Sequence, residues 1–287
     1  MSWRVAGKRL SVGVPASFIA DTPHLREKTS KVGVVGRACA IFRIDEIVVY
    51  RDDVRTVQNE DLDLITTLLA YMETPQYLRK RLFKLEPNLQ YAGILPPLRT
   101  PHHPLTRKAE DLRVGEHREG YVLSKTREGA LVDIGFEEPA LLAGRQSTLG
   151  KRITVRVTKV GEPVEVALAN PRDIKEYWGY TVITSDSLRQ LTTRNQWDLR
   201  IGTSKQGSAF AKVAKELGSK WKNAGSILVV FGAPTRGLYE IARDEGARLD
   251  ELMDYVVNTV PRQGTETVRT EEAVLASLAV LNVEFGF

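Results

Sequence analysis

The sequence predicts an α/β domain that is interrupted by a small all-β barrel of the OB type. Strand and helix patterns alternate up to about residue 95 and again after residue 171, which is typical of one α/β domain. Between these parts, short alternating segments without a helical stretch predict a small closed barrel. We therefore expect a discontinuous α/β domain at 1–95 and 171–287, with the barrel at 96–170.

The first part of the α/β domain begins with alternating element types. Apolar runs predict strands at 10–14 and 44–50, and the residues from 24 to 42 have helical spacing. A second helix is expected from Asn59, a residue suited to capping it, because the apolar residues that follow line one helical face. Pro75 ends that helix, and a short basic helix follows it.

The barrel is predicted from four short segments, 120–123, 130–134, 152–158 and 164–168. Each alternates apolar and polar residues over the length of a short strand, and turn residues separate them. A proline-rich run, 96–104, forms a stiff entry into the region. We expect about five strands in all.

After residue 171 the α/β pattern resumes. Strands are expected at 178–183 and 197–202, with a helical turn at 187–191 between them and a helix to about residue 217 after them. The last helix is expected at 270–281, where acidic residues in the first turn suit the helix dipole.

Two further strands stop at turns that contain glycine and proline. The apolar run 227–231 enters the turn 232–237, and the run 255–257 stops at 258–264. Apolar runs without alternation predict strands covered on both faces, and ligands of open α/β sheets bind beyond the carboxyl ends of such strands. The two turns therefore predict a pocket built from backbone that suits a flat, polar cofactor. Two ordinary connecting turns are the alternative interpretation.

Composition narrows the class of protein. The 287 residues are 42% hydrophobic and 27% charged, which is typical of a soluble globular protein. A net charge of +5 fits an anionic partner such as RNA. The single cysteine, Cys39, excludes a disulfide within the chain, favours a reducing compartment, and is expected to be a core residue. The sequence has no apolar run of about 18 residues, so we expect a cytoplasmic protein without a membrane span.

Three motifs resemble those of the SPOUT, or α/β-knot, RNA methyltransferases. Residues 29–37 are similar to the first motif, with Gly33 and Arg37 in place and Lys31 where many members have asparagine. Residues 231–238 resemble the second motif, with Pro234 at the usual glutamate position, and residues 258–273 resemble the third. The departures at Lys31 and Pro234 leave the specific catalytic roles open.

Other segments resemble one subgroup, the archaeal and eukaryotic putative RNA methyltransferases with an OB-like insert. They are residues 15–17, 73–80, 95–98 and 101–104, so that the resemblance covers almost the whole chain. It implies a trefoil-knotted, Rossmann-like domain, a homodimer, and S-adenosylmethionine (SAM) as cofactor. The contacts that it implies for SAM are Ile201, Gly202, Thr203, Phe231, Gly232, Pro234, Asn258, Thr259, Val260, Pro261, Gln263, Gly264 and Thr265.

Arg37 and Arg236 are the candidate catalytic residues. A guanidinium group can hold a phosphate or orient a target nucleotide, and Arg236 lies beside the expected cofactor loop. The structural alternatives are a helix-surface arginine in a salt bridge for Arg37 and an exposed loop arginine for Arg236.

Basic residues predict RNA contacts outside the cofactor site. The short helix after Pro75 interleaves basic and aromatic side chains, and the barrel strands are rich in lysine and arginine. A solvated helix face and a purely structural barrel are the alternatives. His102 and His103 are adjacent on an extended segment, so their side chains point to opposite sides, which argues against a shared metal ion. The remaining interpretations are a hinge, an RNA contact or plain loop structure. The RNA-contact candidates are Arg79, Lys80, Arg81, Lys84, His102, His103, Arg118, Lys125, Arg127 and Arg152.

The sequence therefore predicts a SAM-dependent RNA methyltransferase without a metal, for which ribosomal RNA is favoured over tRNA as the substrate. The acceptor nucleotide, and the choice between base and ribose, stay open. The alternative is a non-catalytic RNA-binding protein of ribosome assembly that retains the knotted fold.

Overall fold

The computed structural model describes residues 7–105, 111–144, 148–194 and 196–287. The chain divides into two compact units. Thr74–Leu85 and Arg99–Trp178 form a barrel unit, and the described residues up to Glu73, Glu86–Leu98 and Gly179–Phe287 form an α/β unit. The segment 74–85, which the sequence analysis assigned to the α/β domain, is thus part of the barrel unit. Residues 106–110 and 145–147 of the predicted barrel lie outside the described residues.

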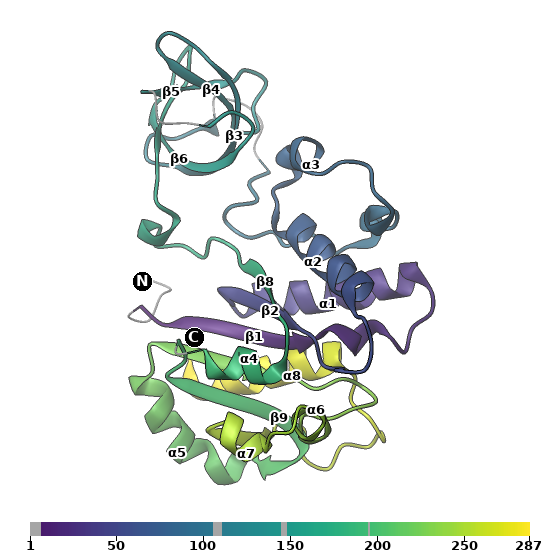
Figure 1. Cartoon of the computed structure of the whole chain (residues 1–287). Helices are drawn as coiled ribbons and strands as arrows, with labels where there is room; N and C mark the ends of the chain where they lie inside the picture. The colour runs from purple at the N-terminus through teal and green to yellow at the C-terminus, as the bar shows by residue number, and fades with distance from the viewer. Residues whose placement is uncertain (1–6, 106–110, 145–147, 195) are drawn as a thin grey trace. The chain divides into compact units, whose positions relative to one another are not determined.

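A parallel sheet forms the centre of the α/β unit (Figure 1). Among the described residues its order is β11-β9-β10-β1-β2-β8. Inner strands such as β1 and β2 are buried at nearly every position, which explains why apolar residues predominate in them. The strands are Arg9–Pro15 (β1), Glu46–Tyr50 (β2), Thr181–Ser185 (β8), Leu199–Ala209 (β9), Ser226–Val230 (β10) and Tyr255–Asn258 (β11).

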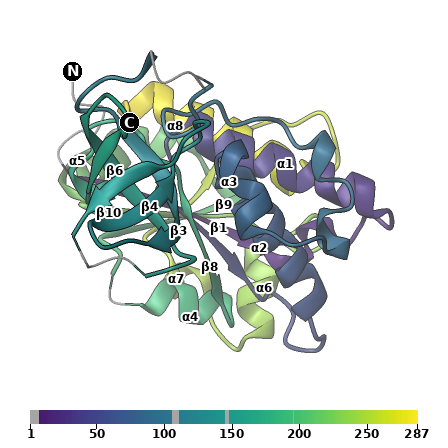
Figure 2. The ribbon, with the colours of Figure 1, turned by 90° about the horizontal axis from the view of Figure 1, so that it is seen from above.

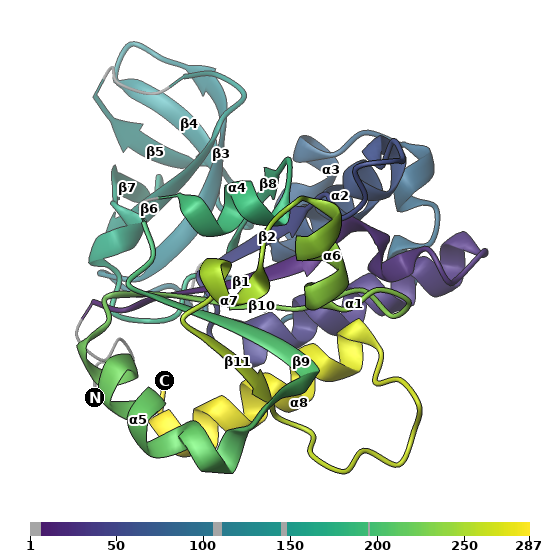
Figure 3. The same ribbon diagram turned by 60° about the horizontal axis from the view of Figure 1, so that its bottom comes forward.

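Helices cover both faces of this sheet. Helices α4 (Leu188–Thr193), α6 (Leu238–Asp244) and α7 (Leu249–Leu252) pack on one face around a buried apolar cluster. On the other face lie α1 (Leu25–Ile41), α5 (Phe210–Asn223) and α8 (Thr270–Phe285), as Figure 3 shows.

Helix α1 packs between α8 and α2 (Asn59–Glu73) (Figure 2). Cys39 is fully buried in α1, as predicted, and burial raises the pKa of its thiol. Short 3₁₀ helices lie at Ala16–Ile19, Pro87–Leu89, Ala92–Ile94 and Pro171–Asp173. None of the described helices combines the length and the apolar character that a bilayer span requires.

The barrel unit contains a closed barrel of five described strands in the order β3-β4-β5-β7-β6. Inward-facing residues such as Val122, Val132 and Val155 form its core. A short helix, α3 (Gln76–Leu82), belongs to the same unit. The sequence predicted four of the strands; the fifth, β5, was missed because all four of its residues are apolar and show no alternation. The strands are His117–Lys125 (β3), Gly129–Asp133 (β4), Ala140–Ala143 (β5), Arg152–Lys159 (β6) and Glu165–Leu168 (β7).

The prediction that a strand ends at Gly202 and that a helix begins just after Thr203 and Ser204 is wrong. Strand β9 continues to Ala209, and α5 begins only at Phe210. The register with β11 explains the extension, because Val256 is opposite Gly202 while the next residue, Val257, is opposite Ser208. Residues 203–207 are therefore displaced from the pairing with β11. Because these residues are polar, the sequence did not indicate that the strand continues through them to Ser208 and Ala209, which pair with β11.

The carboxylate of Asp198, just before β9, should make the stability of the α/β unit depend on pH. Its Oδ2 accepts hydrogen bonds from the backbone N–H of Ser226 and of Gly225, both at 2.9 Å, and from Ser226 Oγ at 3.1 Å. These bonds, led by that of the Ser226 N–H, hold the pKa of Asp198 below its usual value. Because the folded-state pKa is lowered, this stabilisation is complete above about pH 4 and is lost as the pH falls through the folded-state pKa. Asp198→Asn should therefore destabilise the protein at pH 7 but much less at low pH, as urea unfolding at both pH values would measure.

The exposed Asp250→Asn is the matched control. If Asp198→Asn lowers the free energy of unfolding by the same amount at both pH values, the Asp198 carboxylate does not stabilise the protein in the way proposed.

Candidate cofactor-binding site

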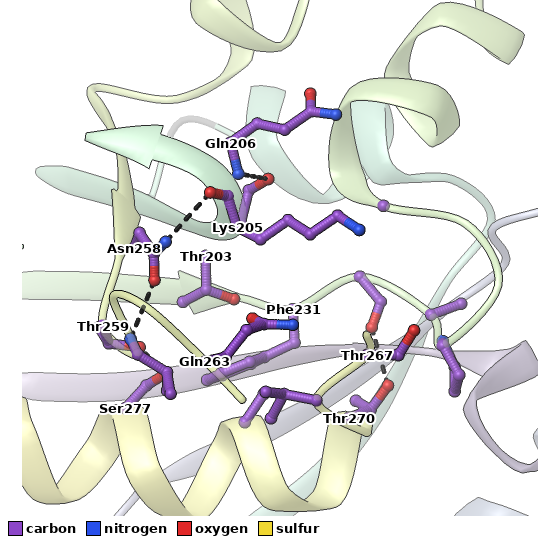
Figure 4. A pocket seen from close by; sticks show the side chains of 18 of the residues that line it. Thr203, Lys205, Gln206, Phe231, Asn258, Thr259, Gln263, Thr267, Thr270 and Ser277 are labelled. Atoms are coloured by element: carbon purple, nitrogen blue, oxygen red, sulfur yellow. Dashed lines mark hydrogen bonds between the residues drawn. The ribbon is translucent and has the colours of Figure 1, made fainter. Parts of the chain in front are cut away.

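A pocket of about 620 Å³ lies beyond the carboxyl ends of β10 and β11, beside the middle of β9 (Figure 4). Residues 203–206 of β9 form one side, the turn after β10 forms another, and the loop after β11 with the first turns of α8 closes it. This is the region in which the sequence predicted a pocket, and the two glycine- and proline-bearing turns do meet there. Three segments, each separated from the next by more than 15 residues along the chain, thus share one cavity.

The turn after β10 is fixed at its first residue, Phe231. The Phe231 N–H donates to Gly13 O at 2.9 Å, and the buried Tyr50 hydroxyl donates to Phe231 O at 2.6 Å. Burial raises the pKa of Tyr50 well above its usual range, so the phenol remains a donor. The main chain therefore enters the pocket in one defined direction.

Gly232, the next residue, lies where the backbone folds closely on itself. A Cβ at this position would lie 3.0 Å from Leu238 N and 3.2 Å from Gly237 Cα. Its carbonyl accepts a hydrogen bond from Thr270 Oγ1 at 2.8 Å, which joins this turn to the start of α8. A side chain at this position would have to displace the backbone of the turn by a few tenths of an ångström.

The loop after β11 is held by the side chain of Asn258. Its Nδ2 donates to Lys205 O at 3.0 Å, and its Oδ1 accepts from Val260 N at 3.0 Å (Figure 4). Thr259 Oγ1 and Ser277 Oγ lie 2.7 Å apart, which joins the loop to α8. Asn258 therefore connects two walls of the pocket.

Replacing Asn258 by alanine should weaken binding of the expected cofactor by up to about thirtyfold, since two hydrogen bonds worth about 1 kcal/mol each hold the walls together. Isothermal titration with SAM would measure the change. Asn223→Ala, at the exposed end of α5, is the control. Equal affinity of the Asn258 variant and wild type would contradict the role of this side chain.

Eight of the thirteen residues predicted to contact SAM line the pocket: Thr203, Phe231, Gly232, Pro234, Asn258, Thr259, Val260 and Gln263. Ile201 and Gly202 are buried within β9, because that strand extends beyond its predicted end. Pro261, Gly264 and Thr265 are exposed in the loop after β11, outside the lining.

Sequence reasoning missed several lining residues. Thr270, Ala273 and Ser277 line the pocket from α8, and their helical spacing was a signal that could have found them. Strand β9 adds residues that had been assigned to a helix. The missed residues include Ser204, Lys205, Gln206, Tyr239, Glu240, Glu266, Thr267, Val268, Thr270, Ala273 and Ser277.

Neither candidate catalytic arginine is among the lining residues. Arg37 donates from α1 to the carbonyls of Pro97 and Leu98. Lys31, at the asparagine position of the first motif, is buried and pairs with Asp21 at 2.5 Å. Both side chains thus hold neighbouring segments of the α/β unit.

Arg236 is surrounded by carboxylates. It pairs with Asp52 at 3.1 Å and with Asp53 and Asp244 at 3.3 Å each, and it donates to Asp52 O. Arg236 therefore joins the turn after β10 to the residues after β2 and to the end of α6.

The predicted RNA-contact residues all belong to the barrel unit, and they differ in exposure. Arg118 is 1% exposed, pairs with Glu116 at 2.6 Å and covers the Phe136 ring at 4.8 Å, so that it is a buried residue and not a surface contact. His102 is also fully buried, which corrects its assignment as a contact. The side chains of Lys80, Lys84, Lys125 and Arg127 are exposed, and His103 is partly buried.

The three remaining arginines make contacts within the barrel unit. Arg81 pairs with Asp133 at 3.0 Å, Arg152 pairs with Glu119 at 2.6 Å, and Arg79 donates to Thr74 O at 2.9 Å. The described residues contain no cluster of three or more side chains suited to hold a metal ion.

Comparison with known proteins gives relatives over most of the chain. A human protein named 28S rRNA (uridine-N(3))-methyltransferase is 37% identical over 95% of this chain and 77% of its own length. The fruit-fly protein of the same name is 32% identical over 95% of this chain and 61% of its own length. An uncharacterized protein of Halobacterium salinarum is 35% identical over 95% of this chain and 98% of its own length.

A solved structure described as that of an hypothetical protein covers 99% of this chain and 68% of its own, with a TM-score of 0.38 and 14% identity. The family model described as "Putative RNA methyltransferase" matches residues 9–281. The chain therefore belongs to this family of RNA methyltransferases.

Proposed function

We propose that this chain uses SAM to methylate N3 of a uridine in ribosomal RNA. The observation that carries the proposal is its 37% identity, over 95% of its length, to a human protein named for that reaction. The pocket beyond the carboxyl ends of the strands supports it, because ligands of open α/β sheets bind there.

The lining residues fit an adenosyl cofactor. The pocket volume of about 620 Å³ lies within the range of about 300–1,000 Å³ that is usual for small-molecule sites. Phe231, Val260 and Val268 supply apolar surface for a base, and Thr203 and Gln263 supply polar groups. The close turn at Gly232 brings the main chain to the cavity without an intervening side chain.

When bound, SAM supplies an electrophilic methyl group on a sulfonium. The residues of the chain must hold the uridine ring in line with it and exclude water. Because N3 of uridine carries a proton, that proton must pass to a base or to solvent as the new bond forms. The carboxylates of Glu240 and Glu266 line the pocket and are able to accept it.

Titration with SAM and a methyl-transfer assay test this function. Labelled SAM and ribosomal RNA from a strain lacking the protein should yield a labelled N3-methyluridine at one position, identified by mass spectrometry of nucleosides. Absence of SAM binding would overturn the proposal. Binding of SAM without transfer to any RNA would favour the alternative, a non-catalytic protein of ribosome assembly.

From the resemblance we also propose a SPOUT-type trefoil knot at the carboxyl-terminal segment and a homodimer formed through α1 and α8. Support for the dimer comes from apolar side chains left exposed on these two adjacent helices, Val34, Ile41, Leu275 and Val283. Val283 is 85% exposed. A second copy of the chain would cover this apolar surface.

Leu275→Asp with Val283→Asp should convert the dimer to a monomer in light scattering after size exclusion. Val57→Asp is the control, because Val57 is 86% exposed but lies on neither helix. A dimer that survives the paired substitution would contradict this interface.

A further inference from the structure

Helix α5 carries a row of exposed lysines. Lys212, Lys215 and Lys222 are separated by three and seven residues, so their side chains lie on the same side of the helix. We call these three residues the lysine stripe. Lys220 lies outside it, because its ammonium group covers the Tyr255 ring at 5.1 Å.

The lysine stripe starts near the pocket. Strand β9 runs directly into α5 (Figure 3), and Lys205 of β9 lines the pocket. Among the described lining residues, Lys205 is the one with a cationic side chain. Lys8 Nζ donates to Lys222 O at 2.9 Å and to Ala224 O at 3.0 Å, which places the far end of α5 beside the start of β1. The stripe therefore runs from the side of the pocket towards the amino-terminal ends of the strands, along a helix of about 21 Å.

Lys222 lies in the last turn of α5, where a cation favours the helix, but helix stability does not explain the other two lysines of the stripe. Cations are unfavourable near a helix amino terminus, yet Lys212 and Lys215 lie in the first two turns and the first turn has no acidic residue. The one carboxylate of α5, Glu216, accepts a hydrogen bond from the Tyr255 hydroxyl at 2.6 Å. Within the described part of the chain, none of the three stripe lysines forms an ion pair.

We propose that the lysine stripe binds the phosphate backbone of the RNA substrate and leads the strand to the pocket. This inference rests on the proposed function and extends it. Lysines suit this role because their charge attracts phosphates without selecting a sequence. It gives the α/β unit an RNA-binding surface of its own, whereas the RNA-contact candidates predicted outside the cofactor site all belong to the barrel unit.

The salt dependence of RNA binding tests the proposal on the full chain. Fluorescence anisotropy with labelled oligouridylate would compare wild type with the Lys212→Gln, Lys215→Gln, Lys222→Gln triple variant from about 50 to about 200 mM salt. The slope of log K against log salt is negative, and loss of three phosphate contacts should reduce its magnitude by about 2, at roughly 0.7 per contact on single strands. The corresponding triple lysine-to-arginine variant should keep the wild-type slope.

The matched control removes the same charge from the opposite face of the sheet. Arg189, Arg243 and Arg248 are exposed on or beside α4, α6 and α7, and their replacement by glutamine should leave the slope unchanged. Equal slopes for wild type and the lysine triple variant, or equal losses in both triple variants, would overturn the proposal. So would failure of wild type to bind the probe.

SAM titration separates this inference from the function on which it rests. Both triple variants should bind SAM as wild type does. If wild type methylates RNA and the lysine variant keeps the wild-type slope, the proposed role of the lysine stripe is wrong and the proposed function is supported. If the slope falls while SAM does not bind, the stripe stands as an RNA surface and the methyltransferase function is wrong.

Discussion

Replacing Gly232 by alanine should weaken SAM binding by roughly ten- to a hundredfold, the equivalent of the about 1–3 kcal/mol that an overpacked methyl group costs. The added Cβ would lie 3.0 Å from Leu238 N and 3.2 Å from Gly237 Cα, which are backbone atoms that cannot move aside by a rotamer change. The turn would have to open, and opening would disturb the hydrogen bond from Thr270 to Gly232 O. Isothermal titration would measure the loss.

Gly93→Ala is the control for this substitution. Gly93 is exposed in the same α/β unit, and an added Cβ there would meet no atom within 4 Å. Its SAM affinity and melting temperature should match those of wild type. If Gly232→Ala binds SAM as tightly as wild type, then the backbone of this turn does not shape the cofactor site.

Replacing Arg236 by methionine should lower the free energy of unfolding by about 3 kcal/mol, because it removes the cation from a buried carboxylate. The Asp52 side chain is 0% exposed and accepts hydrogen bonds from Ser17 and Gln58 in addition to Arg236. Without the guanidinium its charge would lose its nearest compensation. Urea unfolding measures the change, and SAM affinity should fall too, because Arg236 anchors the turn after β10.

Arg248→Met serves as the control here, because Arg248 is 77% exposed and reaches Glu251 only at 3.8 Å. A pair of this kind contributes less than about 1 kcal/mol. Combining Arg236→Met with Asp52→Asn should recover part of the loss, since no buried charge then remains. Equal losses for the Arg236 and Arg248 variants would show that the carboxylate cluster does not depend on Arg236.

The pocket was predictable because its strands have a strong local signature. The run 227–231 is apolar at every position, as a strand buried on both faces requires, and the turn after it contains glycine. The sequence also predicted four strands of the barrel from their alternation. Each of these features depends on residues close together in the chain.

Other residues were assigned wrongly because their environment depends on distant partners. Arg118 was taken for a surface residue from its charge, but Glu116 and Phe136 enclose it in the folded barrel unit. Strand β9 continues past Gly202 because Ser208 and Ala209 pair with residues of β11, almost 50 residues later in the chain. The local propensity of a segment does not depend on such distant partners and therefore cannot predict them.

The sequence by itself determined the class of the protein: the buried parallel strands, the separate barrel and the motifs of an RNA methyltransferase family. The tertiary structure alone decided which side chains share the pocket, and it assigned Arg236 to a buried carboxylate cluster and the lysines of α5 to one exposed row. The physical reason is the distance along the chain over which each of these signals acts. Hydrophobic periodicity acts between near neighbours in the chain, whereas a binding site is formed by segments that only the folded sheet brings together.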